Sequence, residues 1–131
     1  MKKYHNALQA HSIKKFTEYI EKVKAGTAKI NAATLYPYNI LEDCQLEEDW
    51  HSDTFYLRNW NEVAEAQWKA LPNYVEGENN ILVMADTSGS MAGRPLLTSI
   101  GLAMYFAERN RGAFKDTFLT FSRVPSLVKL K

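Results

Sequence analysis

The sequence has 131 residues, of which 46% are hydrophobic and 12% aromatic. This length and composition predict one domain-sized folded unit and exclude a disordered or low-complexity chain. Sixteen basic and fifteen acidic side chains leave a formal net charge of +1, which excludes a strong overall basic field that would attract nucleic acid or anionic lipid.

The cysteine content and the apolar stretches bear on the cellular compartment. Cys44 is the only cysteine, so the chain has no internal disulfide, and we expect a buried or half-buried thiol. The N-terminus lacks the apolar core of a secretory signal, and no apolar stretch is long enough to span a bilayer. We therefore expect a cytoplasmic protein with no membrane contact.

The first half of the chain predicts helices. Apolar residues recur every three or four positions between Ala7 and Lys24, which predicts a helix that ends near Gly26. Residues 39–56 predict a short helix capped by Asn39 and then a loop. A further helix begins after Asn59 or Asn61. The residues expected on the buried faces of the first and last of these helices are Ile13, Phe16, Ile20, Val23, Trp60, Val63, Ala64, Gln67, Trp68 and Leu71.

The second half predicts a strand, a helix and a second strand. Ile81–Ala85 is a continuous apolar run typical of a buried strand, and a small polar loop follows it. Pro95 then suits the first position of a helix that Asn110 ends, and Thr117–Phe121 predicts the next strand. This order implies a right-handed parallel crossover. A third strand is predicted to begin within residues 126–131. The helix is expected to bury Leu96, Leu97, Ile100, Met104 and Ala107.

The polar loop after the first of these strands carries the chemistry. Asp86, Ser88 and Ser90 alternate around a tight turn in which Gly89 relieves the backbone, so their oxygens can converge on one cation. Such oxygen ligands favour Mg²⁺, Mn²⁺ or Ca²⁺ over zinc. In an open parallel sheet, ligands bind beyond the carboxyl ends of the strands, where this loop is predicted to lie.

The segment from residue 81 to residue 122 resembles the start of a von Willebrand factor A domain. Its DTSGS sequence matches the D-x-S-x-S part of the metal-ion-dependent adhesion site of that family, and ILVMA and GRPLLTSIGLAMYFAER resemble the first strand and first helix. The resemblance implies that Ser88 and Ser90 coordinate the ion and that Asp86 supports it directly or through water. The family's remaining threonine and aspartate ligands would lie beyond residue 131, so we expect a fragment with weak or absent metal binding.

The front of the chain carries a looser resemblance. SIKKFTEYIEKVKAGTAKINAATLYPYNIL and the Trp-rich helix look like uncharacterised bacterial and viral proteins that join a helical region to an A domain and are similar to the Ro ribonucleoprotein group. The expected fold is α/β, with a helical region at 1–76 packed on a partial Rossmann-like parallel sheet at 77–131. The resemblance implies a metal-dependent protein-binding module, without catalysis, in which a carboxylate of a protein partner fills an open metal position.

Two alternatives stay open. The polar loop could be an ordinary turn whose hydroxyls cap backbone groups. The second alternative is RNA binding, which the similarity to the Ro group and a group of lysines favour, with Tyr19 and Tyr36 available to stack on bases. Glu18 and Glu21 reduce the positive charge of this group. The lysines of this group are Lys14, Lys15, Lys22, Lys24 and Lys29.

Enzyme classes with a similar loop fit less well. A haloacid dehalogenase type of site would need a second carboxylate where Ser88 stands, and a serine hydrolase would need a G-x-S-x-G elbow. The phosphate-binding glycine motifs and the P-loop lysine are also missing from the sequence.

Overall fold

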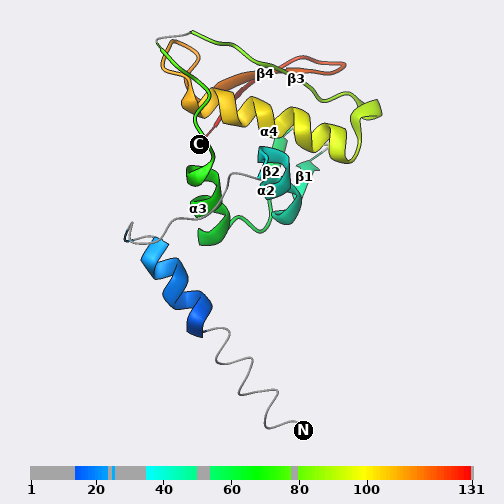
Figure 1. The fold of residues 1–131 in the computed structure, drawn as a ribbon. Coiled ribbons are helices and arrows are strands. Elements are labelled where there is room, and N and C mark those ends of the chain that lie inside the picture. The colour runs from blue at the N-terminus through cyan, green and yellow to red at the C-terminus, as the bar shows by residue number, and fades with distance from the viewer. Residues whose placement is uncertain (1–13, 24, 26–34, 50–53, 78–79, 131) are drawn as a thin grey trace, which may run out of the picture.

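A computed structural model describes residues 14–23, 25, 35–49, 54–77 and 80–130 (Figure 1). Residues 14–23 are helical, as predicted. The elements that follow are α2 (Pro37–Asp43), β1 (Leu46–Asp49), β2 (Thr54–Leu57), α3 (Glu62–Ala70), β3 (Met84–Asp86), the 3₁₀ turn η1 (Gly89–Met91), α4 (Arg94–Arg109), β4 (Thr117–Phe121) and β5 (Leu127–Lys129). Within the described residues, no helix is long and apolar enough to cross a membrane.

Helix α4 is the central layer of this mixed α/β structure. Figure 1 shows it between the sheet that contains β3 and β4 and the group formed by α2, α3, β1 and β2. Its apolar residues recur with helical spacing on two faces. Ile100 and Tyr105 pack with α2 and α3, whereas Ala103 and Ala107 pack with Ala85 and Phe118 of the sheet. The small alanines allow the helix axis to lie close to the strands.

The sheet confirms the predicted parallel crossover and corrects the rest of its topology. Strands β3 and β4 are parallel neighbours, with Ala85 opposite Thr120. The third strand, β5, is antiparallel to β4, so the sheet is mixed and the expectation of a parallel sheet was too simple. Only five residues separate β4 from β5, and a parallel connection would require a longer crossover.

Strand β3 is shorter than the predicted Ile81–Ala85 and begins at Met84. The Val83 carbonyl still accepts a hydrogen bond from the Leu119 amide, at 2.8 Å. Ile81 instead bonds to the side chain of Asn110, which donates to its carbonyl at 2.6 Å and accepts from its amide at 3.3 Å. A side chain thus replaces the neighbouring strand as the partner of this part of the backbone.

The segment after α2 differs from the prediction at residues 46–49 and 54–57. A loop was predicted there, but β1 and β2 form an antiparallel pair with Leu46 opposite Leu57. Glu47, one of the acidic residues that concealed this strand, accepts hydrogen bonds from the Tyr56 hydroxyl at 2.6 Å and from the Arg58 guanidinium at 2.8 Å. Cross-strand pairs of this kind offset the low strand propensity of glutamate.

The helix starts confirm one predicted cap and correct another. Asn61 caps α3, since its side-chain oxygen accepts from the amides of Val63 at 2.9 Å and Ala64 at 3.1 Å. Asn39 is not the cap of α2. That helix begins after Tyr36, and the Asn39 side chain accepts from the Tyr36 amide at 2.9 Å.

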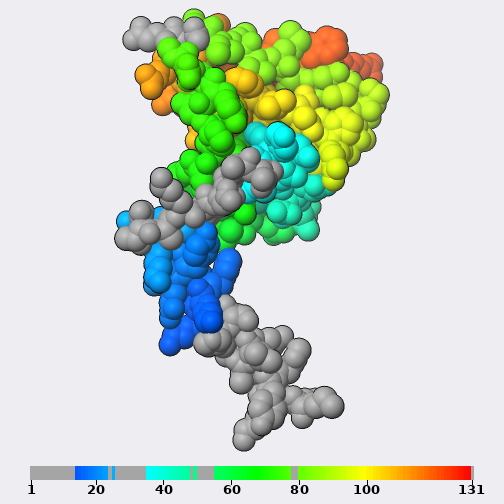
Figure 2. Space-filling model, viewed as in Figure 1, coloured from blue at the N-terminus to red at the C-terminus, as the bar shows by residue number. Residues whose placement is uncertain are grey.

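Burial follows the prediction only in part. Trp68 is buried, as predicted, while Trp60 is half-buried against the same core. In the helix of residues 14–23, Ile20 is buried but Phe16 is 54% exposed, contrary to the prediction. Figure 2 shows this helix at one end of the molecule, in blue. The predicted apolar stripe of this helix is therefore only partly buried. Ile13 and the predicted stop at Gly26 lie outside the described residues.

Candidate functional site

The loop from residue 86 to residue 93 lies at the carboxyl ends of two parallel strands. Asp86 is the last residue of β3, and the Thr87 amide donates to the carbonyl of Phe121, the last residue of β4, at 2.9 Å. Gly93 has a φ of 88° at the entry to α4, a left-handed conformation that glycine adopts without steric cost. The loop thus stands at the sheet edge where open α/β structures bind ligands.

Three side-chain oxygens come together in this loop. The Ser88 hydroxyl donates to Asp86 Oδ1 at 2.6 Å, and the Ser88 amide donates to the same oxygen at 3.0 Å. Ser88 Oγ lies 3.2 Å from Ser90 Oγ. Ser90 is exposed and the other two residues are half-buried, so solvent reaches the group. The structure therefore brings together the three residues that the sequence selected.

The hydrogen bonds of Ser88 also affect the charge of the loop. They lower the pKa of the Asp86 carboxyl from its ordinary value, the hydroxyl bond having the larger effect and the amide bond the smaller. Both donors stabilise the ionised carboxylate relative to its neutral form. Asp86 is therefore negatively charged at neutral pH and protonates only in acid.

Replacing Ser88 with alanine is expected to raise the pKa of Asp86, because the larger of its two stabilising hydrogen bonds is lost. The amide bond from residue 88 should remain, so the pKa should stay below its ordinary value. The Asp86 carboxyl carbon, followed by NMR through an acid titration, measures this change. Ser90→Ala is the matched control, since the Ser90 hydroxyl contacts the Ser88 hydroxyl and not the Asp86 carboxylate. An unchanged pKa in Ser88→Ala would contradict the role given to this hydroxyl.

The donor set suits a hard cation but does not complete its shell. One carboxylate and two neutral hydroxyls are oxygen ligands of the kind that Mg²⁺, Mn²⁺ and Ca²⁺ accept, and Mg²⁺ prefers about six ligands. Among the described residues, no group of three or more His, Cys, Asp or Glu side chains could hold a metal ion. Any ion at Asp86, Ser88 and Ser90 would take its other ligands from water or from further groups.

The lysines selected for RNA binding are only partly described. Lys14, Lys15 and Lys22 are exposed on the helix of residues 14–23, and Glu18 and Glu21 are exposed on the same helix. Lys24 and Lys29 lie outside the described residues. RNA binding therefore stays a prediction from the sequence.

Cys44 is the buried thiol that the sequence predicts. It is 2% exposed and packs with Leu41 and Ala64. Burial, and secondarily the charge of Asp43, raises the pKa of its thiol. A neutral, enclosed thiol is a poor nucleophile, so Cys44 serves packing.

Sequence reasoning missed the roles of two residues. Asn110 was predicted only to end α4, and its bonds to Ile81 join two distant segments. Asp116 received no role, yet it has a φ of 58° directly before β4. Aspartate tolerates the left-handed region better than most residues. The sequence carried no signal for either role beyond the residue type.

Comparison with known proteins places the chain in a family. A family described as "Domain of unknown function (DUF2828)" matches residues 1–80, which is more than half of the sequence. The chain belongs to this family. This agrees with the expected membership of an uncharacterised group, and the family's description states no activity.

A viral relative extends the similarity. "Uncharacterized protein L728" of Acanthamoeba polyphaga mimivirus is 26% identical over 114 residues, which is 85% of this chain and 18% of that protein. Because 85% of the chain is covered, the similarity reaches past residue 80 into the segment of β3, the polar loop and α4. The chain thus spans less than a fifth of this relative's length. No solved structure matches the chain.

Proposed function

We propose that the Asp86–Ser90 loop is part of a metal-ion-dependent protein-binding site of the von Willebrand factor A type. The observation that carries the proposal is the convergence of Asp86 Oδ1, Ser88 Oγ and Ser90 Oγ at the carboxyl edge of a parallel strand pair. The D-x-S-x-S spacing and the strand, loop and helix order of that family support it. A protein partner would bind by placing a carboxylate on the ion.

The hydrogen bonding of the loop is compatible with an ion. A serine hydroxyl has one donor and two acceptor lone pairs. Ser88 uses its hydrogen to reach Asp86, so Ser90 is the donor at the 3.2 Å contact between the two hydroxyls. One lone pair of Ser88 then stays open for a cation, and the bond to Asp86 draws electron density toward the Ser88 oxygen. The charged Asp86 supports the ligand while attracting the cation, the arrangement by which groups beyond the first ligands orient and tune a metal site.

Ligand counting predicts weak affinity for this chain. Two hydroxyls are neutral donors, and one carboxylate supplies the charge, so several positions around Mg²⁺ stay with water. Binding is therefore expected in the millimolar range or weaker. Water-filled positions are also what a partner's carboxylate would need, since it must replace a water to reach the ion. The proposed role requires no catalytic step.

A paramagnetic ion can test weak binding residue by residue. Mn²⁺ added to the ¹⁵N-labelled chain is expected to broaden the amide signals of residues 87–91 first, because those amides surround the three oxygens. Ser88→Ala should abolish this selective broadening, since it removes one ligand oxygen and weakens the support of Asp86. Added Mg²⁺ should reverse the broadening in the unaltered chain by competing for the same oxygens.

The matched control is Ser99→Ala, which removes a hydroxyl from the middle of α4 and should leave the broadening unchanged. If Mn²⁺ broadens residues 87–91 equally in the unaltered chain and in Ser88→Ala, the loop is a capped turn and the proposal is wrong. Broadening spread over all exposed carboxylates, without preference for this loop, would lead to the same conclusion.

A further inference from the structure

A second candidate site lies at the other end of the parallel strands from the Asp86 loop, next to the start of β4. It is a cavity of about 490 Å³ at the C-terminal end of α4, beside the residue that precedes β4. Trp60, Trp68 and Met104 form much of its apolar wall. Its acidic lining consists of Glu65, Glu108 and Asp116.

The two tryptophans are held in fixed orientations. Their rings meet edge to face, with centroids 6.0 Å apart and planes inclined by 71°. The Trp60 indole nitrogen donates to Glu65 Oε2 at 2.9 Å, and the Trp68 indole nitrogen donates to Glu108 Oε2. Each indole therefore draws a carboxylate to the cavity, and the aromatic wall is ordered before any ligand arrives, which lowers the entropic cost of binding.

The three carboxylates differ in how far they are neutralised. Glu65 pairs with Lys69 at 2.8 Å, and Glu108 lies 3.3 Å from the Arg109 guanidinium. The Asp116 side chain has neither a hydrogen bond nor an ion pair with any residue that the structure describes. Among the described residues, Asp116 is thus the one carboxylate of this lining that has no charged partner.

The backbone holds Asp116 at this position. Its amide donates to the Ala107 carbonyl at 2.8 Å, and its carbonyl accepts from the Leu130 amide at 2.7 Å. These bonds fix a φ of 58°, a sparsely populated conformation for a residue with a side chain. Strained positions of this kind are common at ligand sites, and here the strain places a carboxylate at the cavity.

The rings beside the cavity already hold one cation. The Arg109 guanidinium lies 4.1 Å from the centroid of Tyr105 and 5.9 Å from that of Trp68. Its side chain is largely enclosed, at 13% exposure. Aromatic faces attract cations through their negative quadrupole, most strongly where water is excluded. The rings of Trp68 and Tyr105 therefore form an environment that stabilises positive charge.

We infer that this cavity binds an alkylammonium group, with its methyl groups against Trp60, Trp68 and Met104 and its charge directed to Asp116. The aromatic and aliphatic wall suits a poorly hydrated organic cation, whereas the carboxylates repel anions. A neutral apolar ligand would leave the Asp116 charge partly desolvated and unpaired, which is costly. A quaternary ammonium group occurs both in small molecules such as choline and in the side chain of trimethylated lysine.

Choline chloride and its neutral isostere 3,3-dimethylbutan-1-ol test the inference on the full chain by isothermal titration calorimetry. The two probes share their shape and differ in charge. Choline is expected to bind about tenfold more tightly, the ratio that corresponds to about 1.4 kcal/mol of cation–π and ionic attraction. An N-acetylated trimethyllysine amide, with its unmethylated form as reference, identifies the source of the ammonium group. Tighter binding of the trimethyllysine amide than of choline indicates a lysine side chain, and tighter binding of choline indicates a small molecule.

Asp116→Asn removes the charge while asparagine still tolerates the left-handed backbone, and it should weaken choline binding by about three- to tenfold. Asp43→Asn, an exposed carboxylate on α2 outside the cavity lining, should leave choline binding unchanged. Equal binding of choline and the neutral isostere would overturn the inference without reference to any variant. Unchanged choline affinity in Asp116→Asn would show that the ammonium charge is not directed to Asp116.

Discussion

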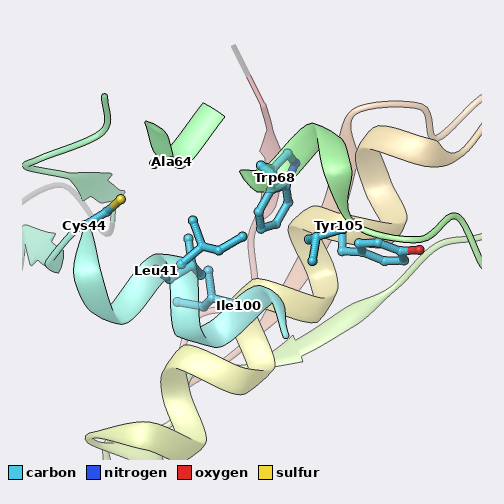
Figure 3. Close-up of a cluster of buried hydrophobic side chains, with 8 residues drawn as sticks. Leu41, Cys44, Ala64, Trp68, Ile100 and Tyr105 are labelled. Atoms are coloured by element: carbon cyan, nitrogen blue, oxygen red, sulfur yellow. The ribbon is translucent and has the colours of Figure 1, made fainter. Parts of the chain in front are cut away.

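Replacing Ile100 with alanine is expected to lower the free energy of unfolding by about 2–5 kcal/mol, the range for truncating a buried aliphatic side chain to alanine. Ile100 is 1% exposed and packs where α2, α3 and α4 meet. Figure 3 shows Ile100 together with Leu41 and Trp68 in the space between these helices. Truncation leaves a cavity among side chains from all three helices, and they cannot collapse into it without moving a helix.

The matched control for this prediction is Leu102→Ala in the same helix. Leu102 is 43% exposed, so its truncation removes little buried surface and should change stability by only about 0.5 kcal/mol. Urea unfolding followed by tryptophan fluorescence measures both variants, since Trp68 lies in the same cluster as Ile100. Similar unfolding free energies for the two variants would contradict the central position of α4 in the core.

Local sequence patterns predicted the elements whose determinants are local. The apolar run at 81–85, Pro95 and the stop at Asn110 were enough to predict the parallel crossover from β3 through α4 to β4. The hairpin of β1 and β2 was missed because Glu47 in its acidic first strand is stabilised by Tyr56 on the other strand and by Arg58 just after it. Strand propensity depends on such neighbours, which a single segment does not reveal.

The two candidate sites differ in the same way. Asp86, Ser88 and Ser90 stand two residues apart in one loop, so their proximity follows from chain geometry and could be predicted. The cavity beside Asp116 joins side chains from β2, α3, α4 and the residues that flank α3, β4 and β5. Nothing in the sequence near Asp116 or Trp60 indicates that they line one space, because they lie far apart in the chain and only tertiary packing brings them together.

Asn110→Ala is expected to destabilise the protein by about 1–3 kcal/mol, the cost of leaving buried polar partners unsatisfied. Asn110 is 1% exposed. Its amide group donates to the Ile81 carbonyl at 2.6 Å and accepts from the amides of Ile81 at 3.3 Å and Arg111 at 3.0 Å. Alanine can make none of these bonds. Two of the three bonds are made to Ile81, in the segment that leads into β3, so the loss should concentrate there.

Chemical denaturation gives the total effect, and hydrogen exchange at the Ile81 amide locates it, because that amide should exchange faster in Asn110→Ala. Asn73→Ala is the control: the Asn73 side chain accepts one bond from the Val75 amide at 3.0 Å, at an exposed position where water can replace it. If Asn110→Ala lowered the free energy of unfolding no more than Asn73→Ala, the role of Asn110 would be limited to ending α4. A larger cost, with fast exchange at Ile81, would show that one buried amide fixes the approach of the chain to Asp86.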